Sequence, residues 1–494
     1  MIRDRHRNRD EPTRSGLETA LGRYRPLFGE IVDDWDGFID ALLRPLPPCV
    51  WSHPARIGAS SFRALIADEG VCAEPVRWLE HAGTGRALRL PPGFRAGQRW
   101  WYCAGLAHAQ EEVSQLPVLA MDLHPGNRVL DLCAAPGGKT AQIALAIGNR
   151  GTLLANDFAP ERIAALQGNL DRLGIVNCST TWCDGANYPV GAGSFDRVLV
   201  DAPCSSEGTL RRNRSLAARL GPGRSERMAG RQRALLRKAA QLCRPGGRIV
   251  YSTCTFAPEE NEIIVAEALD EAQGRLRLLP FPVEGLATSP GVTRWQGRVL
   301  DPLLALCTRV WPHLNDTGGF FVAVLQKAAD APEVSPATPA RLHLEEEDRC
   351  WVDRITGHYG LGPWAESRYR LHRQTRRGLH VIAADHAPPN APAAQGSGLF
   401  VHRTNVRPPK LTTGGALLLG PLATRQGLDL TAVQRDAYLR RRSFTPSAEQ
   451  IRECRAGQVL VRYLGFTLGV AVLHRSGTLE SLFPRRWSGC TAGA

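Results

Sequence analysis

Apolar runs alternate with amphipathic stretches between residues 127 and 326. Short apolar runs bounded by turn residues are typical of buried strands, and apolar residues at helical spacing are typical of the helices that cover them. We expect strands at residues 128–133, 152–157, 197–202, 248–254 and 319–325, and helices at residues 140–147, 160–173, 226–242 and 258–271. This alternation predicts an α/β fold with a doubly wound, mostly parallel, Rossmann-like sheet. Ligands of such sheets bind at the carboxyl ends of the strands.

Pro-rich stretches divide the remainder of the chain. Residues 331–339 and 387–398 consist largely of Pro, Ala, Gly and Ser, which predicts two linkers. The segment between them is basic and contains Arg368, Arg370, His372, Arg373, Arg376 and Arg377. A Gly- and β-rich module follows. We therefore expect an N-terminal α/β region at 1–115, the Rossmann-like domain at 116–328, a basic middle segment at 340–386 and a C-terminal β-rich domain at 398–494.

Bulk composition narrows the class of protein and its partners. A length of 494 residues corresponds to about three domains. An apolar fraction of 43% with 22% charged residues is typical of a soluble globular protein. The formal net charge of +13 favours polyanionic partners, with nucleic acid first. A surface charge kept for solubility is the alternative explanation.

The N-terminus and the cysteines indicate a cytoplasmic protein. The first 16 residues carry both signs of charge and lack the apolar core of a secretory signal. No run approaches the ~18 apolar residues of a membrane span, so we expect no membrane partner. The 13 cysteines include no CxxC pair, which argues against a zinc site and against a disulfide framework. We expect thiols in a reducing compartment and no metal.

A small-residue turn after the first expected strand has the character of a cofactor loop. The sequence LDLCAAPGGKT leads from a strand through two glycines to a helix, whose first N–H groups can bind an anion. It is not a P-loop, because Cys133 stands where the first glycine is required, and the GxGxxG sequence of dinucleotide sites is absent. The interpretation that remains is a loop that binds a nucleoside-type cofactor. Its expected contacts are Cys133, Ala134, Ala135, Pro136, Gly137, Gly138 and Lys139.

Three carboxylates lie at the ends of three successive strands, counting a further expected strand that ends at Asp184. Asp157 is placed to hold ribose hydroxyls, Asp184 to accept from an adenine amine, and Asp201 to face the same crevice. Arg162, in the helix after Asp157, is a further candidate contact. Each aspartate alone is more often a helix cap or a turn residue.

Two cysteines end neighbouring strands of the expected sheet. Cys204 follows Asp201-Ala202-Pro203, and Cys254 follows Ser252-Thr253. A cysteine at such a position, near a lysine, can act as a thiolate nucleophile. A single cysteine is more often a buried structural thiol. Position alone does not say which of the two would attack.

Three motifs together resemble the Sun-type RNA cytosine-5 methyltransferases: LDLCAAPGGKT, VDAPCSSEGTLRRN and YSTCTFAPEENE. The C-terminal module, with DAYLR and YLGFTLG, resembles the PUA-like RNA-binding tail of the bacterial RsmF-type members, which modify small-subunit ribosomal RNA. The resemblance implies an S-adenosylmethionine-dependent methyltransferase sheet, and an N-terminal region that takes part in RNA recognition.

The resemblance also implies roles for individual residues. Cys254 would attack carbon 6 of cytosine, Cys204 would assist release, and Asp201, with Lys139 nearby, would act on ring nitrogen 3. The target would be a flipped or single-stranded cytosine. The implied substrate is 16S ribosomal RNA, free or in the small subunit, and the expected state is a monomer. A transfer RNA methyltransferase and a non-catalytic RNA-binding assembly factor remain as alternatives.

The chain departs from the family pattern at two places, and one neighbouring loop is open to two interpretations. Ser206 occupies the position of a usual glycine, which is expected to alter the loop backbone. VWSHPAR at residues 50–56 replaces the usual Arg-Val-Asn-Thr-Leu, which bears on RNA recognition. Arg211, Arg212 and Arg214 follow the Cys204 loop and could bind phosphates, or could simply form a solvated basic loop.

Overall fold

The structure of the protein is a computed structural model. It describes residues 14–22, 24–219, 223–334, 338–344, 346–362, 368–375, 378–404 and 410–488. The charged first 13 residues, residues 335–337 of the first expected linker, and Arg376 and Arg377 of the basic segment lie outside the described residues.

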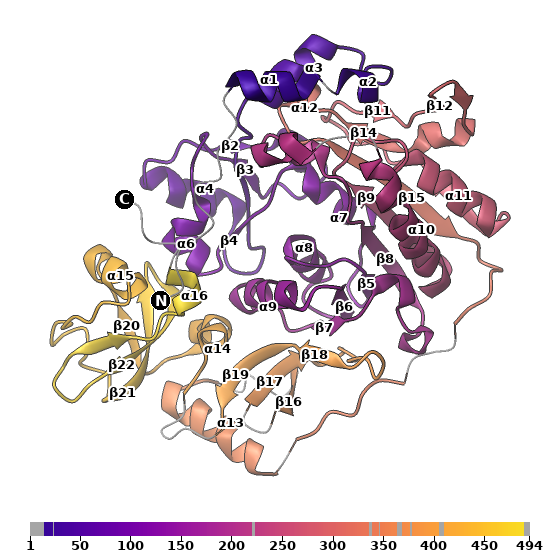
Figure 1. The fold of residues 1–494 in the computed structure, drawn as a ribbon. Coiled ribbons are helices and arrows are strands. Elements are labelled where there is room, and N and C mark those ends of the chain that lie inside the picture. Colours follow the sequence, from indigo (N-terminus) through magenta and orange to yellow (C-terminus); the bar gives the residue numbers. More distant parts are fainter. Residues whose placement is uncertain are drawn as a thin grey trace.

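A large mixed sheet forms the centre of the molecule, and its fold is Rossmann-like (Figure 1). Its parallel strands are β5 (Arg128–Asp131), β6 (Thr152–Asp157), β7 (Cys178–Trp182), β8 (Phe195–Asp201) and β9 (Cys243–Thr253). They lie in the spatial order β7-β6-β5-β8-β9. Antiparallel strands extend the β9 side of the sheet: β15 (Phe320–Lys327), β14 (Thr308–Val310), β11 (Ser289–Pro290) and β10 (Leu276–Leu279). The α/β prediction is confirmed.

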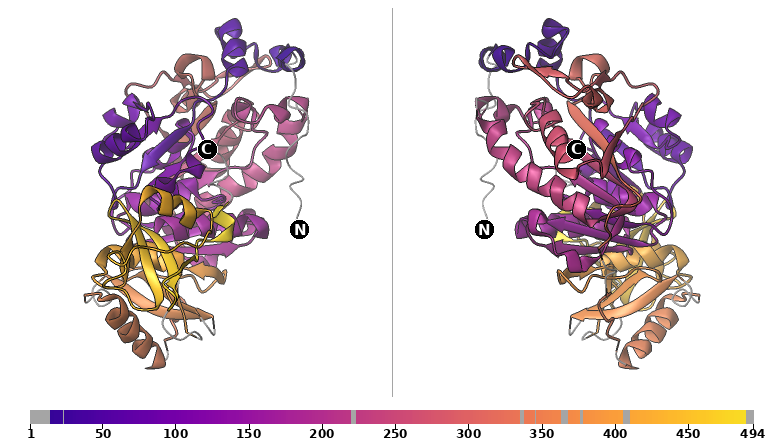
Figure 2. Two further views of the ribbon diagram at one scale, coloured as in Figure 1. Left: turned by 90° about the vertical axis from the view of Figure 1, so that its left-hand side faces the viewer. Right: turned by 90° about the vertical axis from the view of Figure 1, so that its right-hand side faces the viewer.

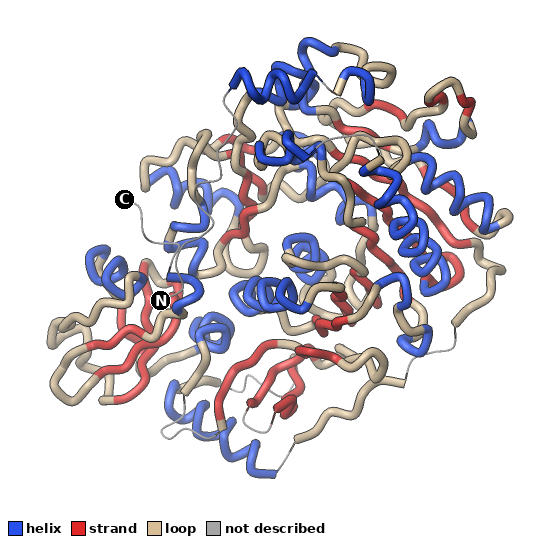
Figure 3. The backbone as a smooth tube through the Cα atoms, in the orientation of Figure 1, coloured by secondary structure: helices blue, strands red, loops and turns tan. Residues whose placement is uncertain are grey.

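Helices cover both faces of this sheet, as Figure 3 shows. One face packs on α7 (Leu116–Ala120), α8 (Gly138–Ala146) and α9 (Pro160–Leu173), and the other on α10 (Arg224–Leu242) and α11 (Glu262–Ala272). Adjacent residues of one strand point to opposite faces. Val129 therefore lies in one core and Leu130 in the other.

Two boundaries differ from the sequence-based expectation by more than two residues. Strand β9 begins at Cys243, ahead of the expected residue 248, because Cys243 pairs with Phe195 across a bulge and the intervening Pro-Gly-Gly residues are included. Helix α11 begins at Glu262, after a separate turn that the Glu260 N–H closes on the Ala257 carbonyl at 3.1 Å.

The N-terminal region contains two parts. Helices α1 (Arg14–Gly22), α2 (Arg25–Phe28) and α3 (Trp35–Leu43) share an apolar cluster with Phe256 and Trp311, next to α12 (Pro312–Asn315). A small antiparallel sheet follows, with the strand order β2 (Glu74–Pro75), β3 (Ala87–Arg89), β1 (Cys49–Ser52) and β4 (Ala107–Ala109). Its helices are α4 (Ala59–Asp68), α5 (Arg77–His81) and α6 (Trp100–Cys103). Outside the N-terminal region, β12 (Arg294–Trp295) and β13 (Arg298–Val299) form a separate hairpin.

The expectation of a linker at residues 387–398 is wrong. Strand β18 (Ala394–Ser397) pairs antiparallel with β7 and extends the central sheet. The edge of β7 offers unpaired backbone groups, which a passing segment can satisfy. Ser397 Oγ lies 2.9 Å from Ser179 Oγ, and His386 Nε2 lies 2.8 Å from the same hydroxyl. The segment therefore seals the sheet edge.

Strands from the middle segment, residues 340–386, and from the start of the C-terminal module form one sheet. After α13 (Glu346–Tyr359), strands β16 (Tyr369–Thr375) and β17 (Gly378–Ala383) pair antiparallel, and β17 pairs with β19 (Leu399–Arg403). Residues 340–386 and the start of the C-terminal module are therefore joined by strand pairing across the expected boundary.

The C-terminal module packs against the N-terminal region, as the two views of Figure 2 show. Its sheet consists of β20 (Gly427–Asp429), β21 (Gly457–Tyr463), β22 (Phe466–Leu473) and β23 (Leu479–Ser481), and its helices are α14 (Thr413–Leu419), α15 (Ala432–Leu439) and α16 (Arg485–Ser488). One apolar cluster contains Trp100 and Trp101 together with Tyr438. None of the helices described is long and apolar enough to cross a membrane.

Gly398 tests the sealing of the sheet edge. It has φ +64°, and a Cβ there would lie 2.2 Å from the Val381 carbonyl oxygen. Gly398→Ala should lower the free energy of unfolding by clearly more than Gly477→Ala, which carries a similar backbone strain of about 1–2 kcal/mol but has open space for the methyl group. Urea denaturation measures both. Equal losses would show that the close approach of Gly398 to β17 is unimportant.

Candidate active site

The carboxyl ends of three adjacent strands meet at one pocket. Asp131 ends β5, Asp201 ends β8, and Cys254 directly follows β9. A pocket of about 340 Å³ opens there, and Lys139 and Phe320 also line it. The place at which sequence reasoning expected a site is therefore hollow.

The cofactor loop turns tightly before α8. Gly137 has φ +101°, which favours glycine, and helix α8 begins at the next residue. The Thr140 hydroxyl donates to Asp131 Oδ2 at 2.7 Å, whereas the buried Oδ1 atom has no hydrogen-bond partner among the described residues. Burial raises the pKa of Asp131 from 3.8 to about 7. Sequence reasoning did not single out this carboxyl group.

Lys139 and Asp201 form an ion pair inside the pocket. Lys139 Nζ lies 2.8 Å from Asp201 Oδ2, and the Ser252 hydroxyl donates to Asp201 Oδ1 at 2.9 Å. Burial opposes the positive charge of Lys139, but the carboxylate of Asp201 outweighs it, so the pKa of Lys139 is raised. The ammonium group also lies 5.4 Å from the centre of the Phe320 ring.

The two candidate cysteines are in contact. Cys204 Sγ and Cys254 Sγ are 3.4 Å apart. The hydrogen bond with Cys204 lowers the pKa of Cys254 against the effects of burial and of the Asp201 charge. Smaller contributions from Ser206 and Lys139 also lower it. The same sulfur contact and burial raise the pKa of Cys204. The two thiols therefore differ in pKa, and that of Cys254 is the lower.

Ser206 keeps a backbone conformation that suits glycine. Its φ is +69°, in the left-handed region, which costs a non-glycine residue about 1–2 kcal/mol. Its hydroxyl lies 3.1 Å from the Cys204 carbonyl oxygen and 3.7 Å from Cys204 Sγ. Ser206 therefore occupies a glycine-like conformation at this position, and its side chain reaches the cysteine pair.

A buried polar network supports the Cys204 loop from below. Glu260 Oε2 accepts the Ser205 N–H at 3.0 Å and the Gln232 side-chain N–H at 2.7 Å. Ser205 Oγ donates to Glu207 at 2.6 Å and lies 2.9 Å from the Thr255 hydroxyl. Because these residues come from both cysteine motifs and α10, the network fixes the two cysteine loops relative to each other.

Asp157 and Asp184 lie at their strand ends but are engaged locally. Asp157 accepts the N–H groups of Ala135 and Ala159, both at 3.0 Å, and pairs with Arg162 at 3.3 Å. Asp184 accepts from the backbone of Ala186 at 3.2 Å as the cap of a short helix. Neither residue is part of the pocket lining, whereas Cys133, Ala134, Ala135, Pro136 and Gly138 are. Ribose and adenine recognition by the two aspartates stays a prediction.

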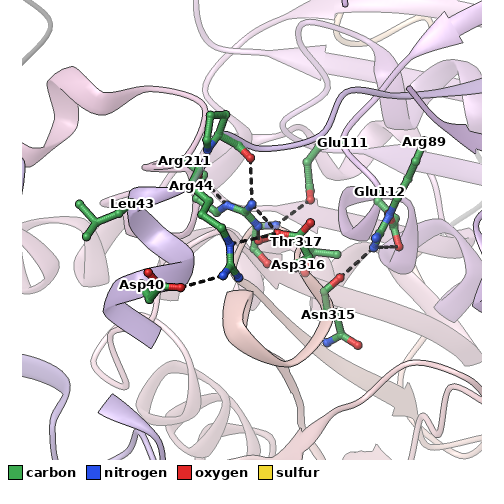
Figure 4. Close-up of polar contacts among 12 residues, drawn as sticks. Asp40, Leu43, Arg44, Arg89, Glu111, Glu112, Arg211, Asn315, Asp316 and Thr317 are labelled. Atoms are coloured by element: carbon green, nitrogen blue, oxygen red, sulfur yellow. Dashed lines mark hydrogen bonds and ion pairs between the residues drawn. The ribbon is translucent and has the colours of Figure 1, made fainter. Parts of the chain in front are cut away.

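Neither interpretation of the basic loop, phosphate binding or solvation, applies to Arg211. Its side chain is 1% exposed and donates to the carbonyls of Thr317 at 2.8 Å and Pro45 at 2.9 Å, and it pairs with Asp316 at 2.6 Å (Figure 4). Arg214 donates to the Leu43 carbonyl at 3.0 Å. Only Arg212 of the three is exposed and lines the pocket.

Figure 4 also shows the polar contacts of Glu111 and Glu112. Glu111 accepts the Gly318 N–H at 3.1 Å, and Glu112 is ion-paired with Arg89 at 2.5 Å. Arg89 in turn donates to the Asn315 carbonyl at 2.8 Å. The N-terminal sheet is thereby fixed to the loop that precedes β15 at the pocket.

Other pocket residues come from outside the expected motifs. His108, Gln110 and Asn169 line the pocket. Trp51 donates to Gln110 at 2.8 Å and is 5% exposed, so the VWSHPAR segment supports the pocket from inside the protein.

Comparison with known proteins identifies the central domain. Residues 118–326 match the model of the family described as 16S rRNA methyltransferase RsmB/F. The central domain is similar to the RsmB/F family. The resemblance that the three motifs indicate is confirmed. The match ends at residue 326, so the PUA-like character of the C-terminal module stays a prediction.

Curated relatives carry a consistent description. The chain is 36% identical over 306 residues to Ribosomal RNA small subunit methyltransferase F of Salmonella paratyphi C, and equally to that of Salmonella choleraesuis. Each alignment covers 60% of this chain and 60% of the relative. The chain therefore matches less than two thirds of the relatives' length.

Solved structures share the fold. A methyltransferase homologue from Pyrococcus horikoshii is 29% identical, with a TM-score of 0.54 over 63% of this chain and 98% of the homologue. NSun6 from the same organism, solved with SFG, has a TM-score of 0.53 over the same shares at 20% identity. The second likeness concerns the fold alone.

The raised pKa of Asp131 predicts a pH-dependent stability. Between its ordinary value of 3.8 and about 7, the folded protein holds a proton that the unfolded chain has lost. Stability therefore falls as the pH rises through this window, by up to about 1.4 kcal/mol per pH unit. Asp131→Asn should make the slope shallower by about one proton in urea denaturation at several pH values. An unchanged slope would contradict a protonated Asp131.

Proposed function

We propose that this protein transfers a methyl group to carbon 5 of cytosine in RNA, with S-adenosylmethionine as methyl donor and Cys254 as covalent nucleophile. The observation that carries the proposal is the contact between Cys254 and Cys204 beside the Lys139–Asp201 ion pair, in a domain similar to the RsmB/F family. Each component has a defined task in that reaction.

Cys254 is suited to attack carbon 6 of cytosine. Carbon 5 is a weak nucleophile until a thiolate adds at carbon 6 and turns the ring into an enamine. The lowered pKa of Cys254, due first to the hydrogen bond from Cys204, favours the thiolate form. The sulfur contact thus supports the choice between two cysteines that their positions in the sequence left open.

Cys204 is suited to the last step. After methylation, water in the open pocket takes the proton from carbon 5, and the bond between Cys254 and carbon 6 breaks with its electron pair left on the Cys254 sulfur. The raised pKa of Cys204 keeps a proton on its sulfur, 3.4 Å from that of Cys254. This proton can form a hydrogen bond to the departing thiolate and so favour elimination.

Asp201 and Lys139 are suited to act on the cytosine ring. Lys139 Nζ donates a hydrogen bond to Asp201 Oδ2 at 2.8 Å, and both residues line the same pocket as Cys254. A hydrogen bond or proton delivered to ring nitrogen 3 draws electrons away from carbon 6 and eases thiolate addition. The Ser252 hydroxyl holds the other carboxylate oxygen and fixes its direction.

The residues around the pocket fit the proposed cofactor. The loop from Cys133 to Lys139 provides a glycine turn and a helix N-terminus, and the buried Asp131 Oδ1 atom has a free acceptor position among the described residues. We expect this loop, Asp157 with Arg162, Asp184 and Asp201 to hold the nucleoside. When bound, S-adenosylmethionine supplies an electrophilic methyl group on a sulfonium.

Small-subunit ribosomal RNA is the substrate that we propose. The support is the similarity to Ribosomal RNA small subunit methyltransferase F and to the 16S rRNA methyltransferase RsmB/F family. A pocket of about 340 Å³ accommodates a base only after it has left its stack, so the target cytosine would be flipped or single-stranded.

A basic groove between the N-terminal region and the C-terminal module supports RNA as the partner. It measures about 710 Å³, and its cationic residues are Arg95, Arg99, Arg435 and Arg440. Arg99 lies over the Phe94 ring at 4.6 Å and Arg435 over the Tyr463 ring at 4.5 Å. Arginines combined with aromatic rings are typical of surfaces that bind phosphates and bases. We propose that RNA flanking the target cytosine lies here.

The cysteine roles are tested by two variants. Cys254→Ala should abolish methylation, because no nucleophile remains. Cys204→Ala should accumulate a covalent adduct with RNA, because elimination slows while addition continues. Denaturing gel electrophoresis with labelled RNA measures the adduct, and Cys103→Ala, a buried cysteine outside the pocket, serves as the control. Wild-type turnover by Cys254→Ala would contradict the mechanism.

The groove is tested by charge reversal. Arg95→Glu combined with Arg440→Glu should raise the Kd for RNA by about tenfold or more and make its salt dependence shallower, because phosphate contacts release counterions. The methylation rate at saturating RNA should stay unchanged. Arg452→Glu, on an exposed side chain of the same module that does not line the groove, is the matched control. Equal effects of both changes would indicate general charge rather than a docking groove.

A further inference from the structure

His108 is a buried histidine that faces the start of α8. It lies on β4, is 4% exposed and lines the pocket. Its Nε2 atom is 3.4 Å from the position that a Cβ would take on Gly138, the first residue of α8. No hydrogen-bond partner of Nε2 occurs among the described residues, although nearly all of the side chain is buried. The mechanism above gives this side chain no role.

Arg172 fixes which nitrogen of His108 carries the proton. The guanidinium Nη2 atom of Arg172 lies 2.7 Å from His108 Nδ1. An arginine can only donate, so Nδ1 must accept, and a neutral imidazole then carries its hydrogen on Nε2. Burial, followed by the charge of Arg172, also lowers the pKa of His108 well below its ordinary value. The ring therefore presents an N–H group to the pocket.

Arg172 itself is held rigidly, so the two nitrogens of the His108 ring cannot easily exchange their donor and acceptor roles. Its Nη1 atom donates to the carbonyls of Tyr102 at 2.9 Å and Ala107 at 3.0 Å. The guanidinium lies 3.8 Å from the centre of the Tyr102 ring, and the same ring stacks on His108 at 18°. Residues of the N-terminal region and of α9 thus orient one imidazole N–H group.

This N–H group and the helix N-terminus converge on the same space. The first-turn N–H groups of an α-helix have no partner within the helix, and the positive end of the helix dipole favours an anion. A neutral donor beside them adds a hydrogen bond without adding charge. The nearby ammonium of Lys139 is already engaged by Asp201. The combination suits a carboxylate.

We infer that the Nε2–H group of His108 donates a hydrogen bond to the carboxylate at the amino-acid end of S-adenosylmethionine, at the N-terminus of α8. The inference rests on the proposed function. Asp157 and Asp184 are expected to hold the nucleoside end, which leaves the opposite end of the cofactor for α8. His108 thereby becomes a binding residue that selects for the carboxylate.

Calorimetric binding of two ligands to three variants of the full chain tests this assignment. The ligands are S-adenosylmethionine and its decarboxylated form, which lacks only the carboxylate. His108→Phe should raise the Kd for S-adenosylmethionine by about tenfold or more, which is the usual effect of losing a hydrogen bond to a charged group. The Kd for the decarboxylated form should stay unchanged. His108→Gln, which can accept from Arg172 and donate into the pocket, should restore most of the preference.

His53→Phe serves as the matched control. His53 is also 4% exposed, but its Nε2 atom bonds to the Leu173 carbonyl at 3.0 Å, away from the pocket. This change should lower the melting temperature without altering the preference between the two ligands. If His108→Phe weakened the binding of both ligands equally, or weakened the binding of neither, the inference would be overturned. If the wild type bound neither ligand, the proposed function would fail, and this inference with it.

RNA binding is measured in parallel to distinguish a phosphate from the cofactor carboxylate. His108→Phe should leave the Kd for RNA unchanged. A loss of RNA affinity, with the ligand preference intact, would place a phosphate rather than the cofactor against His108 and overturn the assignment.

Discussion

The ion pair between Lys139 and Asp201 is the interaction on which the site depends. It joins the cofactor loop after β5 to the end of β8, at 2.8 Å and inside a pocket where bare charges would be unfavourable. Ser252 then connects the pair to β9, the strand that positions Cys254. One contact therefore aligns three strand ends.

Much of this arrangement could be predicted from the sequence because the signals are local. Apolar runs mark β6 and helical spacing marks α9, and both elements have the expected bounds. The order of strands in a parallel sheet brings Cys204 and Cys254 to the carboxyl ends of neighbouring strands. Their contact at 3.4 Å depends on side-chain packing that no local pattern encodes.

The features that could not be predicted depend on partners distant in the sequence. Residues 394–397 have the composition of a linker, but the open edge of β7 provides hydrogen-bond partners and makes them a strand. Arg211 belongs to a basic run, but carbonyl groups of Pro45 and Thr317 surround it. His108 and Arg172 are 64 residues apart and meet only in the fold. Local composition correctly indicates polarity in these cases and gives no information about the partner.

The most direct test of the account uses RNA that contains 5-fluorocytidine. Fluorine at carbon 5 cannot leave as a proton, so the reaction should stop at the covalent adduct after methylation. With S-adenosylmethionine present, digestion and mass spectrometry should find the methylated nucleotide attached to the peptide that contains Cys254. Attachment at Cys204, or the absence of any adduct despite bound RNA and cofactor, would contradict the central claim that Cys254 is the nucleophile.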